Sequence, residues 1–380
     1  MEQPAILITR VGSSRTPDGR AFIRMPFALY HGIPQWVPWF DADVRTLLDR
    51  SHPFFQHSQG EFFLARHDGR AVGRLAVFEN VRYNESHAVH HAQFYFFDSV
   101  NDRQVAVALF AAARDWALGR GLYALTGPLG IGATSGGGIL VDGFDHRAAM
   151  TMMSYNLPYY RELLEGLGFA KYLDLYSYSL EPSTFRLADR VRNVAQIALK
   201  RGSFQVMEFR NKRELKKVAD HVAEVYNTAL GDHPESYSLS AGEIAQVTKD
   251  LMLVADPKLI KILTYKGKVA GFLFGFPDLS KALRAGRGRL NPLSILHLLV
   301  ELRRTNWLII NGAGILPEYQ RLGGNALLYY ELERTVRSSG RFRHVDLTQI
   351  AETTALMLRD IETLGAQRYK THRVYTMAIR

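Results

Sequence analysis

The 380-residue sequence predicts an α/β protein made of two tandem lobes. In each half of the chain a hairpin pattern precedes a strand, an amphipathic helix and a second strand. Each half also contains Leu-Gly-(Phe/Ala), at Leu167 and Leu364, between a predicted helix and a Tyr-rich strand. Because the same order recurs with the same tripeptide, we expect an internal repeat. The predicted division is a first lobe at 1–180, a linker at 181–203 and a second lobe at 204–380.

The first half is delimited by a hairpin at 61–79, because Asp68-Gly69 is a favoured two-residue turn between apolar runs. An amphipathic helix is expected at 103–118, with Asn101 or Asp102 as its N-cap. The other elements expected in this half are a strand at 5–11, a helix at 41–48, strands at 91–97 and 122–126, a helix within 156–172 and a strand at 173–180.

The second half repeats this order after a linker that is itself expected to contain a helix. A hairpin at 259–276 turns at Lys266-Gly267. The remaining elements expected are a strand at 206–210, helices at 212–229 and 242–255, a strand at 344–349, a helix at 353–364 and a strand at 369–379.

The stretch 307–333 contains the clearest functional pattern. A short apolar run suits a buried strand, and Gly312 and Gly314 then interrupt its regularity, as at a bulge or a close approach to the backbone. A glycine turn at 320–325 leads into an amphipathic helix. This arrangement points backbone N–H groups at one spot, which favours a phosphate, although many such turns are purely structural.

This stretch resembles the acyl-coenzyme A-binding core of the GNAT acyltransferase superfamily. The signature of that family is Gln or Arg, two residues, Gly, one residue, then Gly or Ala. Gln320, Gly323 and Asn325 occupy those positions, and Asn325 departs from the pattern. The resemblance covers nearly the whole chain, with sharp motifs only in the second half. It implies two GNAT-like lobes, each a mixed, mostly antiparallel twisted sheet with flanking helices.

The resemblance also implies a donor site for acyl-CoA, or for an acyl carrier protein, without a metal. Backbone amides of the bulged strand would hold the pantetheine and polarise the thioester carbonyl, here those of Gly314, Ile315 and Leu316. The turn and the first helical residues would bind the pyrophosphate, namely Gln320, Arg321, Leu322, Gly323, Gly324, Asn325 and Ala326.

The equivalent turn of the first half, 98–102, has no glycine and contributes two carboxylates where phosphates would lie. Negative charge at that position repels coenzyme A. We therefore interpret the first lobe as a degenerate GNAT-like lobe that shapes the acceptor site.

Acyl transfer to an amine needs a base for the ammonium and an acid for the departing thiolate. By the resemblance, a base projects from the bulged strand or its neighbour, which makes Asp346 and Glu352 candidates. Each has the alternative interpretation of an ordinary cap or surface carboxylate. The helix at 353–364 lacks the Tyr that serves as acid in the family, and Tyr369 is the fallback.

In the first half, Tyr155 and Asn156 are candidates for a cleft between the lobes, with packing as the alternative. Three histidines, His87, His90 and His91, suggest a metal site. His90 and His91 point to opposite faces of a strand, and only Glu85 lies at ligand spacing, so a substrate-facing or general-base role for His90 is favoured over a metal.

Two other segments invite interpretation. The glycine-rich run 127–138 lacks the Lys-Ser/Thr of a P-loop, and we interpret it as a mobile loop over a cleft. An insertion at 278–304 contains a basic run and then a helix, 293–302, that is apolar on almost every face. It is too short to span a membrane, so it either packs against the neighbouring lobe or contacts a lipid surface through 281–304.

The composition limits the protein class. With 47% hydrophobic residues and no cysteine, the chain can bury a core but cannot form disulfides or use a cysteine nucleophile. The net charge of +10 favours anionic partners, although an inert basic surface is the alternative. No nucleic-acid motif is present. No signal peptide or spanning segment is visible in the sequence, which favours a cytoplasmic protein that associates with the inner face of the membrane.

Taken with the resemblance, these features predict an acyl-CoA-dependent N-acyltransferase. The apolar insertion and its basic flank favour a lipid-like acceptor of the long-chain, sphingoid-base type, as in bacterial ceramide synthases. Two alternatives stay open: an N-acetyltransferase for a small polar amine or amino acid, and a non-catalytic acyl-CoA-binding protein.

Overall fold

The computed structural model describes residues 6–131, 135–231 and 233–379. It separates into two compact units. The first comprises Met1–Leu175, Ser280–His297 and Lys370–Arg380, and the second comprises Tyr176–Leu279 and Leu298–Tyr369. Residue 5 of the first predicted strand and residues 132–134 of the glycine-rich run lie outside the described residues.

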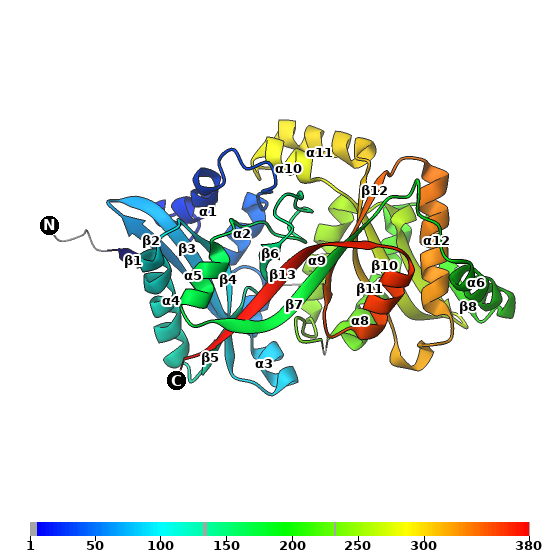
Figure 1. Ribbon diagram of the computed structural model, residues 1–380, viewed down its shortest axis with the longest axis horizontal. Coiled ribbons are helices and arrows are strands. Elements are labelled where there is room, and N and C mark those ends of the chain that lie inside the picture. The colour runs from blue at the N-terminus through cyan, green and yellow to red at the C-terminus, as the bar shows by residue number, and fades with distance from the viewer. Residues whose placement is uncertain (1–5, 132–134, 232, 380) are drawn as a thin grey trace. The chain divides into compact units, whose positions relative to one another are not determined.

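The chain changes units inside two strands, β7 (Ala170–Leu180) and β13 (Gln367–Ala378, red in Figure 1). The units are therefore not the two contiguous stretches 1–180 and 204–380 suggested by the sequence. The last eleven residues complete the first unit, where Tyr375 of β13 lies opposite Gly127 in an antiparallel pair. The segment Ser280–His297 of the predicted insertion also belongs to the first unit.

The sheet of the first unit has the strand order β1-β2-β3-β4-β5-β13-β7. Its pairs are antiparallel in the hairpin β2-β3 and parallel between β4 and β5. The elements are β1 Leu7–Arg10, α1 Pro17–Leu29, α2 Asp41–Leu48, β2 Gln59–His67, β3 Arg70–Glu79, α3 Val81–His87, β4 His91–Ser99, α4 Arg103–Leu118, β5 Ala124–Gly127, β6 Ile139–Asp142, α5 Tyr160–Gly166 and α10 Ser280–Gly286. Strand β6 pairs with β13.

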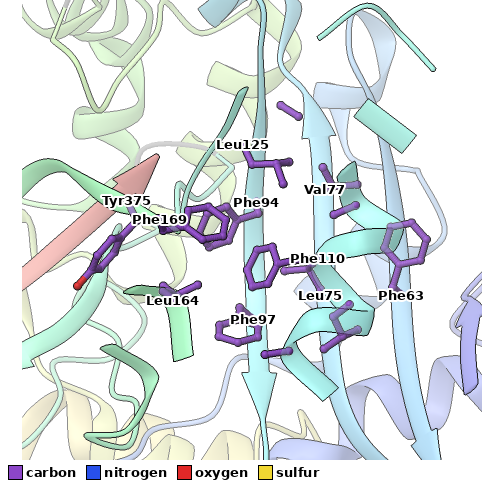
Figure 2. Close-up of a cluster of buried hydrophobic side chains, with 14 of the residues drawn as sticks. Phe63, Leu75, Val77, Phe94, Phe97, Phe110, Leu125, Leu164, Phe169 and Tyr375 are labelled. Atoms are coloured by element: carbon purple, nitrogen blue, oxygen red, sulfur yellow. The ribbon is translucent and has the colours of Figure 1, made fainter. Parts of the chain in front are cut away.

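An aromatic core lies between this sheet and helices α4 and α5 (Figure 2). Phe94 of β4 packs edge-on against Phe110 of α4 at 5.1 Å and against Phe169 at 5.4 Å between ring centroids. Phe97 contacts Phe110 as well. Because α4 carries its apolar residues on one face, its burial holds the helix over the sheet.

The sheet of the second unit has the order β7-β12-β11-β10-β9-β8. Among the described strand pairs of this sheet, β11 and β12 are parallel, whereas β10-β11, β9-β10 and β8-β9 are antiparallel. The elements are α6 Asp189–Arg201, β8 Phe204–Met207, α7 Lys212–Lys217, α8 Ala219–Leu230, α9 Ala241–Val254, β9 Ile260–Tyr265, β10 Lys268–Pro277, β11 Trp307–Ile315, α12 Gly324–Ser339, β12 His344–Ala351 and α13 Ala355–Thr363. The residues of helix α11, Pro292–Arg304, are divided between the two units after His297.

The mixed architecture predicted from the sequence is confirmed, with hairpins turning at Asp68-Gly69 and Lys266-Gly267. Helix α1 is not among the elements expected from the sequence. It contains Pro26, a residue that usually argues against a helix interior, but Thr16 accepts a hydrogen bond from the Gly19 amide and Pro17 occupies the first turn. The N-cap of α4 is Asp102.

Candidate functional site

Strands β11 and β12 separate at the point where the sequence places the bulge. They pair in parallel from Trp307 with His344 to Ile310 with Leu347, and within the described residues their pairing ends there. Gly312 follows with a φ of 101°, a conformation that favours glycine. Beyond it, among the described residues, β11 is paired with β10 alone, so the edge of β11 that faced β12 is unpaired; we call the opening beside this edge the gap.

The three amides predicted to hold the thioester do not all face this gap. The Leu316 amide donates to the Ala270 carbonyl at 2.9 Å. Because bonding in an antiparallel pair alternates along the strand, the Gly314 amide also points toward β10, while the Ile315 amide points toward the gap. Ile315 is therefore the amide best placed to polarise a carbonyl there, and its role stays a prediction.

The glycine turn that follows, 320–325, is tied to the end of β11 by the Gln320 side chain. Gln320 Nε2 donates to the Ile315 carbonyl at 3.2 Å. Arg321 and Gly323 have φ values of 61° and 94°, which turn the chain into α12. Helix α12 starts at Gly324 without a side-chain cap, so its first amides are open to an anion. The Arg321 and Leu322 side chains are exposed at this turn, and Ala326 is buried.

Asn325, the departure from the family signature, has a structural partner. Its side chain forms a hydrogen bond with Asp360 of α13, which counteracts the effect of burial that raises the pKa of Asp360. The side chain of Asn325 thus links α12 to α13, while its backbone amide stays at the helix N-terminus.

The predicted linker, 181–203, packs along helix α12. A Cβ on Gly323 would lie 3.1 Å from Val194 Cγ1 of α6, so any larger residue at the turn meets α6. The Leu187 amide donates to Glu333 Oε1 at 3.2 Å, and Arg337 of α12 donates to the Phe185 carbonyl. Residues 180–187 therefore form one wall beside α12.

An apolar cavity with an empty volume of about 730 Å³ lies within the second unit between these elements. Its wall includes Ala313, next to the predicted thioester-binding Gly314, and Tyr329 of α12. The remaining lining residues are almost all apolar: Leu180, Pro182, Phe185, Leu187, Leu273, Leu308, Ile310, Leu332, Val336, Val345, Leu347, Met357, Ile361 and Leu364, with Glu333 and Arg337 as the charged exceptions.

Asp346 lies on the opposite face of the sheet. Its neighbours Val345 and Leu347 line the cavity, and successive strand residues point to opposite faces. The Asp346 side chain is fully buried. Glu352, just after β12, accepts a hydrogen bond from the Tyr176 hydroxyl at 3.3 Å. The structure thus places both predicted base candidates in the second unit.

The first unit presents a different turn at the equivalent position. The Asp102 carboxylate accepts from the Gln104 amide at 2.8 Å and caps α4. The Ser99 amide donates to the Tyr160 hydroxyl and the Val100 amide to the Val72 carbonyl. The amides that would cradle a phosphate are bonded within the protein, which supports the interpretation of this lobe as degenerate.

Tyr155 lines a second cavity, wholly within the first unit, with an empty volume of about 810 Å³. Burial and then Asp145 raise the pKa of Tyr155. Aromatic rings dominate the wall, with Tyr30 stacked on Trp36 at 5.1 Å. Behind them Asp98 accepts from Arg74 and from the Tyr30 hydroxyl, both at 2.7 Å. Asn156 also lines this cavity, but its side chain is bonded to the backbone of Leu140.

The three histidines do not share a site. His90 is exposed, whereas His87 stacks on Tyr83 with ring centroids 4.1 Å apart. His91 Nδ1 lies 3.2 Å from the Thr126 hydroxyl, and burial followed by His90 lowers the pKa of His91. Among the described residues no group of three metal-ligating side chains was found.

Helix α11 exposes its apolar side chains. Leu293 is 62% exposed and Leu296 56%, and only Ser294 of the helix is buried. Further exposed apolar side chains are Leu290, Ile295, Leu299 and Val300. No helix in the described parts of the chain is long and apolar enough to cross a membrane.

Comparison with known proteins supports the resemblance seen in the sequence. No family model matches the chain. Two curated proteins match along almost their whole length: the protein YghO of Escherichia coli (strain K12), 24% identical over 95% of this chain and 93% of that protein, and the bacterial ceramide synthase of Caulobacter vibrioides, 26% identical over 96% of both.

Among solved structures, a tandem GNAT protein from the clavulanic acid biosynthesis pathway superposes with a TM-score of 0.57, at 14% identity and over 99% of both chains. This likeness confirms the predicted fold, two GNAT-like lobes in tandem. The likeness concerns the fold: the chain folds as two GNAT-like lobes in tandem.

Proposed function

We propose that the chain is an acyl-CoA-dependent N-acyltransferase that transfers a long acyl chain to a lipid-like amine. The observation that carries this proposal is the combination, in one unit, of an uncapped α12 N-terminus, a strand edge opened beyond Ile310, and an apolar cavity beside that edge. The first suits the phosphates of coenzyme A, the second a thioester, and the third an acyl chain.

The reaction is direct attack of the amine on the thioester carbonyl. The Ile315 amide, facing the gap, is the donor available to the carbonyl oxygen as negative charge develops on it. The chain has no cysteine, so a covalent thioester intermediate on the protein is excluded. The amide product and the free thiol of coenzyme A then leave.

The apolar lining of the cavity favours a long acyl chain. Its wall is apolar apart from Glu333 and Arg337, so it favours hydrocarbon over a polar acyl group. Each methylene buried there contributes about 0.8 kcal/mol. A donor with a long chain is therefore expected to bind more tightly than acetyl-CoA.

Two features favour an acceptor presented at a membrane surface. The exposed apolar side chains of α11 adjoin Arg303 and Arg304 in its last turn and follow the exposed Lys281, Arg284, Arg287 and Arg289. An apolar helix face flanked by cations suits the interface of an anionic bilayer. The similarity to a bacterial ceramide synthase agrees with an acceptor of the long-chain amine type. In this proposal the first lobe, with its aromatic cavity, recognises the amine acceptor.

The test is acyl transfer by the purified protein, followed by mass spectrometry of the amide product. We expect palmitoyl-CoA and sphinganine to yield an N-acyl product with one free thiol released per amide. Preference for acetyl-CoA and a small polar amine would replace the lipid acceptor with the small-amine alternative. Binding of acyl-CoA without transfer to any amine would leave the non-catalytic alternative.

A pair of glycine variants links the activity to the turn. Gly323→Asp places a carboxylate and a side chain at the α12 N-terminus, where it meets Val194. Gly340→Asp makes the same change at the other end of the helix, at a φ of 59° and with open space around it. We expect only the first to abolish acyl-CoA binding. Equal binding by both variants would show that the turn is structural.

A further inference from the structure

The loop between α8 and α9 lies on the face of the second unit's sheet opposite the apolar cavity. Helix α8 covers β10 and β11 there: a Cβ on Gly314 would lie 3.0 Å from Ala229 Cβ. Tyr226 of α8 stacks on Phe272 with ring centroids 5.9 Å apart, and Phe272 lies opposite Gly314 in the β10-β11 pair. The end of α8 thus packs directly against β11 at Gly314, next to Ile315, whose amide is predicted to polarise the thioester.

Glu235 of this loop has a buried carboxylate oxygen, Oε2, for which the described residues offer no hydrogen-bond partner. Its other oxygen, Oε1, lies 3.6 Å from His233 Nδ1. The carboxylate acts on Tyr226: burial raises the pKa of Tyr226 to about 12, Glu235 shifts it in the same direction, and a hydrogen bond with Ser236 opposes them. Glu235 therefore lies beside the tyrosine that stacks on Phe272 of β10, the strand paired with β11.

The loop is fixed at both ends. Asn227 of α8 donates to the Leu239 carbonyl at 2.9 Å and accepts from the Leu239 amide at 2.8 Å. Tyr237 donates to Glu243 Oε1 at 2.6 Å, and Ser240 with Glu243 forms a capping box at the start of α9. The Ser236 amide also donates to the His233 carbonyl. These bonds fix the backbone on either side of Glu235, which limits where its side chain can lie.

A buried carboxylate oxygen without a hydrogen-bond donor costs folding free energy. The carboxylate oxygen is not part of the hydrogen bonds that anchor the loop, which are formed by Asn227, Tyr237 and Ser240. The Glu235 side chain is partly exposed, but its buried oxygen is left without a donor among the described residues, so this oxygen is available to accept a proton from a bound amine.

We propose that Glu235 is the general base of the acyl transfer, with His233 as a positioning residue. This rests on the function proposed above. The amine nitrogen gives up a proton to Glu235 Oε2 as its lone pair attacks the thioester carbonyl. The tetrahedral intermediate collapses, the carbon–sulfur bond breaks, and the thiolate of coenzyme A takes up a proton from solvent. The base returns its proton to solvent before the next turnover, so atoms and charge balance.

The decisive variant is Glu235→Gln, which keeps the shape of the side chain and removes its basicity. We expect kcat to fall by a factor of about 10²–10⁴, with the dissociation constant for palmitoyl-CoA and the melting temperature unchanged. Glu235→Asp should recover part of kcat. Glu224→Gln, at an exposed position of α8, is the matched control and should behave as wild type.

The possible outcomes separate the two proposals. An active wild-type enzyme whose Glu235→Gln variant keeps its kcat overturns the assignment of the base and leaves the proposed function standing. Loss of kcat together with an equal loss of donor binding overturns it too, because a base acts after binding. A wild-type protein that transfers no acyl group to any amine overturns both.

Discussion

At the residue scale, Asn325 shows how a departure from a family signature can keep a site intact. Glycine or alanine is expected at this position because the backbone approaches a phosphate closely. In this chain the asparagine side chain turns away to Asp360 of α13, and helix α12 still begins without a side-chain cap. In the proposed donor site the phosphate-binding groups would be backbone amides, which substitution of the side chain does not remove.

Replacing Asn325 with Ala tests this separation of roles. The variant loses the hydrogen bond to Asp360 and is expected to lose about 1 kcal/mol of folding free energy, measured by urea unfolding. Acyl-CoA affinity, measured by calorimetric titration, should change by less than about threefold. Asp360→Asn, which keeps the partner's shape, is the control. If Asn325→Ala abolishes donor binding at unchanged stability, the side chain contacts the ligand.

His372 makes the stability of the first unit depend on pH. Burial, with Lys370 adding to it, lowers the pKa of His372 to about 3, against the hydrogen bond to the Ser154 carbonyl. Above about pH 6.5 the imidazole is neutral in the folded and unfolded chain alike. Below that pH the unfolded chain takes up a proton that the folded one excludes, so stability falls by up to about 1.4 kcal/mol per pH unit until the folded pKa is reached.

His372→Gln keeps a donor for the Ser154 carbonyl and removes the titration. Urea unfolding between pH 7 and 4 should therefore show a shallower loss of stability for the variant than for the wild type. Parallel curves for the two proteins would mean that His372 takes up its proton in the folded state.

At the element scale, helices α4 and α12 occupy the same position in the two lobes and differ at their first residues. Asp102 caps α4 with its side chain, whereas Gly323 leaves α12 uncapped. The sequence predicted this contrast, because a carboxylate N-cap and a glycine turn are local signals. Asp68-Gly69 and Lys266-Gly267 are equally local, since positive φ at both residues fixes the hairpin turn.

Helix α11 gives a prediction of its own. The triple variant Leu293→Ser, Leu296→Ser and Leu299→Ser changes side chains that are each more than half exposed, so its melting temperature should match the wild type. We expect it to lose binding to vesicles that contain phosphatidylglycerol, measured by flotation, and wild-type binding to weaken with salt. Leu118→Ser on α4, also exposed, is the control. Equal flotation of wild type and triple variant would exclude α11 as the lipid contact.

At the scale of the whole molecule, β7 and β13 each contribute residues to both units, and this decides which residues form each unit. Lys370–Arg380 completes the first unit, where Arg373 forms a two-pronged ion pair with Asp174, at 2.8 and 3.0 Å. In a chain that ends at Tyr369, the first unit should therefore no longer unfold cooperatively. The measurement is the near-ultraviolet circular dichroism of its aromatic core during unfolding. A truncated chain that unfolds as the full one does would show that β13 contributes little there.

This division of β7 and β13 between the units also marks the limit of the sequence-based account. The order of elements, the glycine turn and the two lobes follow from local patterns and a motif. The return of residues 370–380 to the first unit, the apolar cavity beside α12 and the unsatisfied oxygen of Glu235 depend on contacts between distant parts of the chain. Periodicity and turn chemistry contain no information about such contacts.

The most direct test of the central claim is a single-turnover reaction of the purified protein with palmitoyl-CoA and sphinganine, read by mass spectrometry. The account predicts an N-palmitoyl amide formed in equal amount to free coenzyme A thiol, and no product with the Gly323→Asp variant. Release of thiol without an amide, or an amide formed equally well by Gly323→Asp, would contradict it.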